Sequence, residues 1–282
     1  MKTNEPKDQF VYTLWAGAIV VCLILSLFSL IFSACAKQSK PETAADKNDF
    51  TIEVDNTEAA EPPEETAAPE THSARLKQTA DAGRSYLDKL IFLGDSTTYG
   101  IGYYYEHGFS DTLCPPSQVW TPASGTLTLA YYDVATIVYP ETGEELSIED
   151  AVKRAQPEYM VITLGVNGVS FMDEDWFIRS YTDLVQIIRE ASPNTKIILN
   201  SIYPVAASYP HQDDINNDKI NAANEWIEQI AENTGVRFLY SFESVVGPDG
   251  NLPEESQNGD GIHLTGEAFT TVMQYIRTHE YQ

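Results

Sequence analysis

The chain has 282 residues and a formal net charge of −25 at pH 7, from 42 acidic and 17 basic side chains. A surface of that charge repels phosphate groups, which argues against nucleic acid and anionic lipid headgroups as partners of the folded part. Of three cysteines, Cys22 and Cys35 belong to an N-terminal apolar region, so Cys114 stands alone and no disulfide can form within a folded domain.

The N-terminal region predicts a membrane tether. No charged side chain interrupts the apolar segment from Phe10 to Ala34, and about 20 such residues span a bilayer. One interpretation is an uncleaved signal anchor. The other is a lipoprotein signal peptide in residues 1–35, with small residues before Cys35 as the lipidated residue, although Phe32 and the length of the segment depart from that pattern. Both interpretations put the remaining chain at the extracytoplasmic face of the cell membrane.

Two further parts follow along the chain. Residues 36–74 are rich in Ala, Glu, Thr, Pro and Asp, a composition that buries too little apolar surface to fold. We expect a disordered acidic linker that acts as a spacer; an acidic interaction tail is the alternative. Residues 75–282 have the length of one domain with a sizeable core.

Apolar runs alternate with amphipathic stretches through the domain. Four buried strands are expected, at 90–94, 159–164, 196–200 and 236–240, with a weaker one at 136–139. Helices are expected at 74–88, after the N-cap Ser147 and ending before Pro157, and at 173–191, 214–234 and 265–278. This order predicts an α/β fold in which helices cover both faces of a parallel sheet. Ligands bind beyond the carboxyl ends of such strands, where Ser96, Asn167 and residues 201–207 fall.

Three residues could supply nucleophilic chemistry. A serine needs a base within hydrogen-bond reach, and Ser96 directly follows the first strand; alternatively it only caps a helix. His263 is the candidate base, and Asp260 is close enough in sequence to orient the imidazole. The alternatives are a surface histidine beside a capping residue, or a metal site. No further His or Cys cluster supports a metal, so none is expected.

Two more residues could stabilise an oxyanion. Gly125 can bring its backbone N–H close to a ligand, and Asn167 can offer its side-chain amide, with the Ser96 N–H as a third donor. Taken singly, each is as well explained as an ordinary turn residue.

Together these segments resemble the SGNH/GDSL hydrolase family. Gly94-Asp95-Ser96 is similar to its first block, Gly125 to the second, Gly165-Val166-Asn167 to the third and Asp260-Gly261-Ile262-His263 to the last. The resemblance implies a three-layer α/β/α sandwich with a central parallel sheet of flavodoxin-like order. It implies Ser96 as nucleophile, His263 as base and Asp260 as its orienting partner. Ser96, Gly125 and Asn167 would form the oxyanion hole, with no metal and no organic cofactor. Gly168 departs from the family, which usually has Asp there.

The expected function is an extracytoplasmic serine esterase for short acyl esters, with O-acetyl groups of an envelope glycan as the favoured substrate. A lysophospholipase, a thioesterase or an acyl transferase to a glycan is the enzymatic alternative, and a catalytically silent glycan-binding lipoprotein is the other. An aromatic stretch, which runs from Tyr99 to Phe109 and on through Trp120 to Tyr132, could stack on sugars or line an acyl pocket; packing is the commoner use of such residues.

Overall fold

The computed structural model describes residues 73–282. The predicted anchor at 10–34, Cys35 and the spacer up to residue 72 lie outside the described residues. Within residues 73–282, no helix combines the length and the apolar character needed to cross a membrane.

A parallel sheet of five strands forms the centre of the domain, in the order β2-β1-β5-β6-β7. The strands are β1 (Leu90–Gly94), β2 (Val119–Trp120), β5 (Tyr159–Thr163), β6 (Lys196–Asn200) and β7 (Arg237–Leu239). Counted by themselves, they follow the flavodoxin-like order 2-1-3-4-5. Every residue of β5 is buried, as expected for a strand covered on both faces. The predicted parallel α/β architecture is confirmed.

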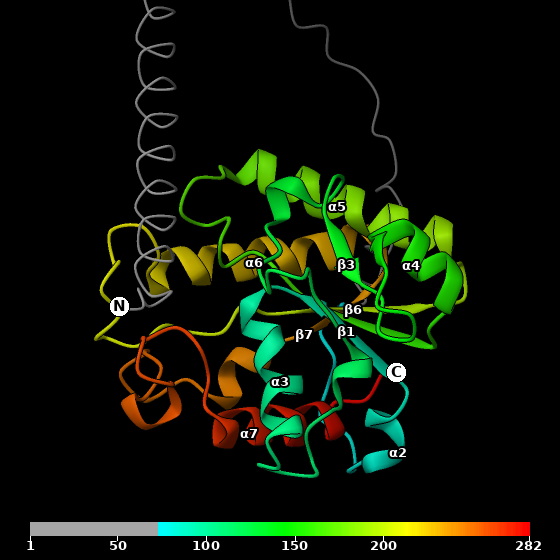
Figure 1. Ribbon diagram of the computed structural model, residues 1–282. Helices are drawn as coiled ribbons and strands as arrows, with labels where there is room; N and C mark the ends of the chain where they lie inside the picture. The colour runs from blue at the N-terminus through cyan, green and yellow to red at the C-terminus, as the bar shows by residue number, and fades with distance from the viewer. Residues whose placement is uncertain (1–72) are drawn as a thin grey trace, which may run out of the picture. The chain divides into compact units, whose positions relative to one another are not determined.

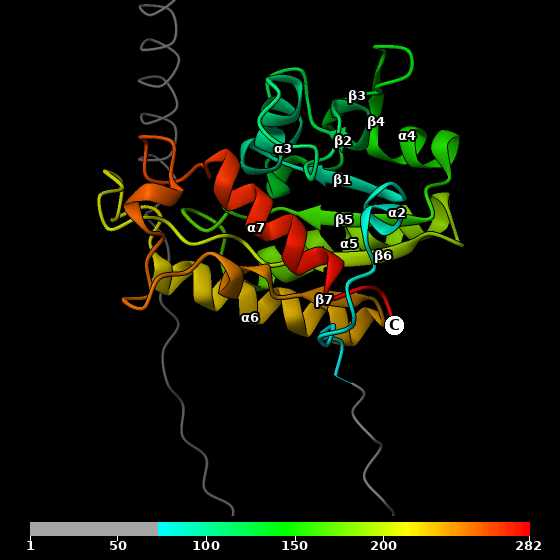
Figure 2. The same cartoon turned by 90° about the horizontal axis from the view of Figure 1, so that it is seen from below.

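Helices cover both faces of the sheet and complete three layers (Figures 1 and 2). One face carries α4 (Ile148–Ala155), α5 (Glu174–Ala191) and α6 (Asn217–Thr234), and the other carries α2 (Arg84–Leu87), α3 (Ser96–Glu106) and α7 (Gly266–Arg277). Short 3-10 helices occur at Pro116–Gln118, Leu129–Tyr131, Ser241–Ser244 and Glu254–Ser256.

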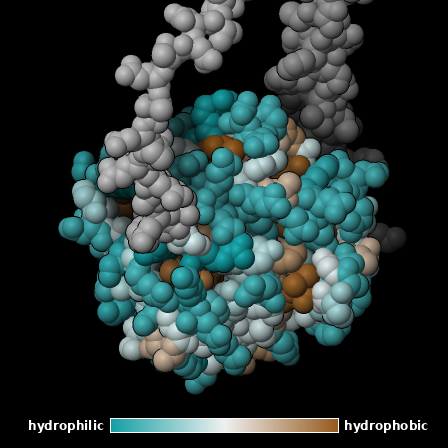
Figure 3. Space-filling view, turned by 180° about the vertical axis from the view of Figure 1, so that it is seen from behind, coloured by the Kyte–Doolittle hydropathy of each residue, from teal (hydrophilic) through white to brown (hydrophobic). Residues whose placement is uncertain are grey.

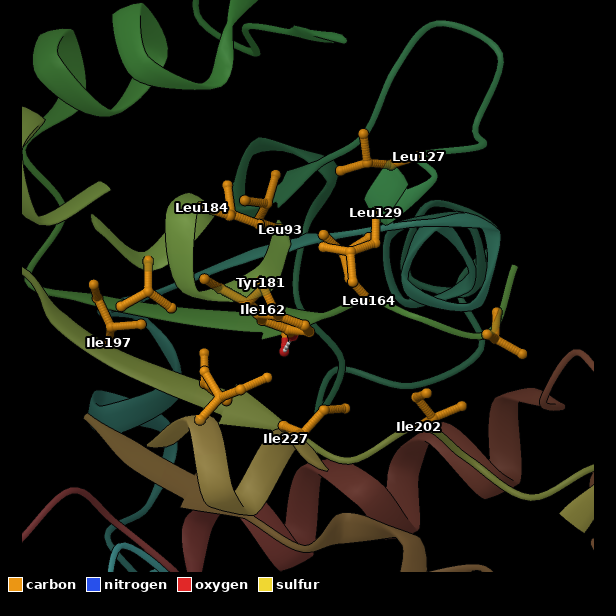
Figure 4. Close-up of a cluster of buried hydrophobic side chains, with 14 of the residues drawn as sticks. Leu93, Leu127, Leu129, Ile162, Leu164, Tyr181, Leu184, Ile197, Ile202 and Ile227 are labelled. Carbon is orange, nitrogen blue, oxygen red and sulfur yellow. Dashed lines mark hydrogen bonds between the residues drawn. The ribbon is translucent and has the colours of Figure 1, made fainter. Parts of the chain in front are cut away.

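Each interface between sheet and helices has its own apolar cluster. Tyr181 and Leu184 of α5 meet Ile162 of the sheet in one cluster, shown in Figure 4. Ile101 of α3 and Phe269 of α7 belong to the other. Figure 3 shows the face behind the view of Figure 1, which is mainly hydrophilic with separate hydrophobic spots. The apolar residues are therefore concentrated between the layers, where they pack the helices against the sheet and fix the positions of the loops at its edges.

Two predicted elements differ from the structure. Of the helix expected at 74–88, only Arg84–Leu87 is helical. The preceding residues run beside β7 instead, because that edge strand offers backbone partners: the Leu76 N–H donates to the Phe238 carbonyl at 2.8 Å. The strand at 136–139 exists as β3 (Thr136–Val138), but it pairs antiparallel with β4 (Glu145–Ser147) in a separate two-stranded sheet.

Candidate active site

Ser96 is the first residue of α3, at the point where β1 ends. Asp95 caps this helix: its carboxylate accepts hydrogen bonds from the Thr97 N–H at 2.9 Å and the Thr97 hydroxyl at 2.6 Å. The Asp95 carbonyl accepts the N–H groups of Thr98 and Tyr99. Among the described residues, the Ser96 N–H has no acceptor. The positive end of the helix and one open donor therefore lie at the serine.

His263 joins Ser96 to Asp260. The Ser96 Oγ lies 2.8 Å from His263 Nε2, and His263 Nδ1 lies 2.6 Å from Asp260 Oδ2. Because an ionised carboxylate only accepts, Nδ1 carries the proton and Nε2 is left to accept the Ser96 hydroxyl proton. The structure thus brings together the three residues that the sequence proposes as nucleophile, base and orienting acid.

The loop itself holds the Asp260 carboxylate. Its Oδ1 accepts the backbone N–H groups of Ile262 and His263, each at 3.0 Å. Partial burial would raise the pKa of Asp260, but these two donors and the His263 ring outweigh it, so the pKa lies below its ordinary value. Asp260 is therefore ionised at neutral pH and can stabilise an imidazolium.

Asn167 follows β5 at the same edge of the sheet at which Ser96 follows β1. β1 and β5 are neighbours with Gly94 opposite Thr163, so both residues lie just beyond adjacent strand ends. The half-buried Asn167 amide donates to the Leu127 carbonyl at 3.3 Å. An amide nitrogen carries two N–H groups, so this bond fixes the side chain and leaves a second donor for a ligand.

Gly125 lies in a turn, and its backbone N–H donates a hydrogen bond within that turn. It donates to the Pro122 carbonyl at 2.8 Å, and the residue has φ +72°, which favours glycine. The turn lies beside the ring of Tyr99 in α3. The oxyanion role of Gly125 stays a prediction, and it would require the turn bond to open.

Gly168, where the family usually has Asp, lies against Met172. A Cβ at this position would be 2.8 Å from the Met172 sulfur and 3.2 Å from the Gly165 carbonyl oxygen. Met172 is itself buried. The chain therefore replaces a carboxylate at this position with apolar packing, and the Leu127 carbonyl is the acceptor that holds Asn167.

Asp95 is a site residue to which the sequence argument assigned no role. It is 1% exposed, and burial raises its pKa to about 6 against the opposing effects of the Thr97 hydrogen bonds and the charge of His263. Its capping bonds position the first turn of α3 and thereby the serine. The signal in the sequence was an aspartate immediately before a helix start, a common capping position.

A buried polar network fastens the strand ends beneath the site. The Asn200 amide donates to the Thr163 hydroxyl at 3.1 Å and to the Tyr203 hydroxyl at 3.3 Å, and the Ser241 hydroxyl donates to Asn200 Oδ1 at 2.6 Å. These residues end β5 and β6 or follow β6 and β7. Sequence reasoning missed them because only the sheet register makes them neighbours.

The sequence model of the GDSL-like lipase/acylhydrolase family matches residues 92–269, which include all of these residues. The chain belongs to this family. It is therefore a hydrolase of ester substrates. No curated protein sequence matches the chain.

Several solved structures share the fold of this chain. One is a candidate platelet activating factor from Streptococcus pneumonia, 18% identical, with a TM-score of 0.51 over 68% of this chain and 84% of that one. Another is a candidate acylhydrolase from Bacteroides fragilis, 19% identical, with a TM-score of 0.50 over 67% of this chain and 84% of that one. At these identities the likeness shows the fold alone.

No group of three or more potential metal-ligating side chains forms within residues 73–282. The surface hollow lined by Leu90, Gln156 and Glu158 among others lies at the amino ends of β1 and β5, away from Ser96. This hollow therefore does not include Ser96, His263 or Asp260.

Proposed function

We propose that this hydrolase is a serine esterase in which Ser96, His263 and Asp260 act as a catalytic triad. The hydrogen-bonded line from Ser96 Oγ through both ring nitrogens of His263 to Asp260 carries the proposal. In a catalytically silent binding protein, nothing would require this alignment.

The reaction has two halves. Ser96 Oγ attacks the acyl carbonyl as its proton passes to His263 Nε2, and Asp260 stabilises the imidazolium. The Ser96 N–H and the Asn167 amide donate to the oxyanion. The C–O bond to the alcohol then breaks, the alcohol takes the proton from Nε2, and an acyl-enzyme remains. A water molecule, deprotonated by His263, attacks that ester and releases the acid and the free Ser96 hydroxyl.

The proposed substrates are short acyl esters, with O-acetyl groups of an envelope glycan as the favoured case. The apolar segment at 10–34 and the acidic residues after it support a location at the extracytoplasmic face of a membrane. Labelling with radioactive palmitate distinguishes the two tethers: a lipidated Cys35 loses its label in Cys35→Ser, whereas a signal anchor carries none at that residue.

The decisive test of the triad is hydrolysis of p-nitrophenyl acetate by the full-length protein in lipid nanodiscs. We expect Ser96→Ala and His263→Ala each to lower kcat by about 10³-fold or more. Ser85→Ala and His211→Ala are matched controls, since both residues are exposed and neither contacts the triad. Equal activity in all five proteins would contradict the proposal.

A further inference from the structure

An aromatic stripe runs along α3 from the proposed nucleophile. Tyr99, Tyr103 and His107, which we term the aromatic stripe, lie three, seven and eleven residues after Ser96 and so share its side of the helix. The Tyr99 and Tyr103 rings are 6.4 Å apart and tilted by 34°, and the Tyr103 and His107 rings are 4.1 Å apart and tilted by 32°. At 1.5 Å per residue, the stripe reaches about 16 Å from Ser96.

The His107 ring is held at the end of the helix, with its Nδ1 2.7 Å from the Tyr103 carbonyl oxygen, but packing within the domain does not account for the two tyrosines of the stripe. Tyr99 is 50% exposed and Tyr103 44% exposed. The side of α3 that packs inward is a different one: Ile101 is buried, and Gly102 lies against Pro116. By contrast, Trp120 from the same aromatic stretch is only 2% exposed and belongs to the core. Large aromatic side chains that remain exposed to solvent beside an active site indicate a binding surface.

The charge of the surrounding segments limits what can bind there. No lysine or arginine occurs in residues 95–135, 164–173, 201–218 or 241–265, which follow the strands at the site's edge of the sheet. The same segments carry many carboxylates, among them Glu106, Asp133, Asp173, Asp214, Asp260. Two cations border these segments, and both already donate to backbone carbonyls: Arg84 to Asp111 and Leu113, and Lys219 to Asp213 and Asp214. A phosphorylated or carboxylated ligand would therefore meet mainly carboxylates and be repelled. A ligand without anionic groups, whose flat faces stack on aromatic rings, is complementary to this surface.

We propose that the aromatic stripe is a docking track for a glycan chain that carries no anionic groups. The inference rests on the proposed function and extends it: while one acylated residue lies at Ser96, further sugar rings of the same chain stack along Tyr99, Tyr103 and His107. The length of the stripe selects oligomers over monosaccharides. The excess of carboxylates selects against anionic polymers and against the phosphate of a lysophospholipid.

The test measures glycan binding to full-length Ser96→Ala protein in lipid nanodiscs by calorimetric titration. Chitohexaose and cellohexaose serve as neutral hexamers and hexagalacturonate as the anionic one. We expect at least one neutral hexamer to bind, at least tenfold more weakly when Tyr99→Ala or Tyr103→Ala is added, and hexagalacturonate not to bind. Tyr105→Ala is the matched control, since this 37% exposed tyrosine of α3 lies roughly 180° around the helix from Ser96. We expect its affinity to stay within twofold.

Three results would overturn the track: no binding of either neutral hexamer, equal weakening in the Tyr105→Ala control, or preferred binding of hexagalacturonate. Hydrolysis of p-nitrophenyl acetate by the protein with Ser96 intact, measured in parallel, separates the two proposals. Hydrolysis without stripe-dependent binding overturns the track alone. Stripe-dependent binding without hydrolysis supports the track and overturns the proposed catalytic function.

Discussion

His263 Nε2 lies 2.8 Å from Ser96 Oγ, although 167 positions separate the two residues in the chain. Ser96 lies just beyond the carboxyl end of β1. His263 lies in the loop before α7, at the same edge of the sheet. Asp260, by contrast, is only three residues from its partner and needs no tertiary contact to reach it.

Asp260→Asn keeps the shape of the side chain but removes the charge that stabilises the imidazolium. It also allows an amide N–H to face Nδ1, which favours the wrong tautomer. We expect kcat for p-nitrophenyl acetate to fall by roughly 10⁴-fold. Asp249→Asn is the control, because that carboxylate also accepts a backbone N–H in a nearby exposed turn but has no contact with His263. A fall in kcat of less than tenfold in Asp260→Asn would show that Asp260 does not stabilise the imidazolium.

Asn167→Leu removes the amide donor while keeping a side chain of similar size. If the second N–H of Asn167 serves the oxyanion, kcat falls by about 10²–10³-fold, since one such donor contributes roughly 3 to 4 kcal/mol. KM should change little, because the bond strengthens as charge develops on the oxygen. A rise in KM at constant kcat would show instead that Asn167 binds the ground state.

Asp95→Asn tests the buried carboxyl through the pH dependence of stability. The native state holds the Asp95 proton more tightly than the unfolded chain, because burial raises the pKa from 3.8 to about 6. The stability from this group is therefore complete below about pH 4 and is lost as pH rises through 6. Asparagine caps a helix equally well but does not titrate.

Urea unfolding at several pH values measures this effect. Between pH 4 and pH 7, we expect Asp95→Asn to gain roughly 2 kcal/mol over the unsubstituted protein. A difference between the two proteins that is the same at both pH values would show that Asp95 is ionised throughout and held by its hydrogen bonds alone.

Cys114 should behave as a structural thiol. It has no exposed surface, and burial raises its pKa to about 12, so little thiolate forms at neutral pH. We expect iodoacetamide to alkylate Cys114 at least about a hundredfold more slowly in the native protein than in urea. Peptide mapping by mass spectrometry identifies Cys114 separately from Cys22 and Cys35. Equal rates in both conditions would point to an accessible, activated thiol.

Much of the fold could be predicted from local pattern. The strands at 90–94 and 196–200 have the predicted bounds, and Ser147 caps α4 by accepting the Asp150 N–H as expected. These features depend on side chains a few residues apart, so a short stretch of sequence contains all the determinants. The prediction of a helix at 74–88 was wrong for the opposite reason. Its first residues instead hydrogen-bond to the edge strand β7, which is distant in sequence.

The features of the candidate site also separate into local ones and ones that depend on tertiary contacts. The sequence alone proposes its residues, because a serine nucleophile needs a base and an oxyanion donor, and it predicts the pairing of Asp260 with His263, because the two are three residues apart. The tertiary structure alone decided that Ser96 meets His263, that the Gly125 N–H is held by Pro122, and that Met172 fills the space beside Gly168. It also decided which tyrosines of α3 are exposed. Each of these depends on which surfaces the layers bury, and that is determined by contacts between distant segments.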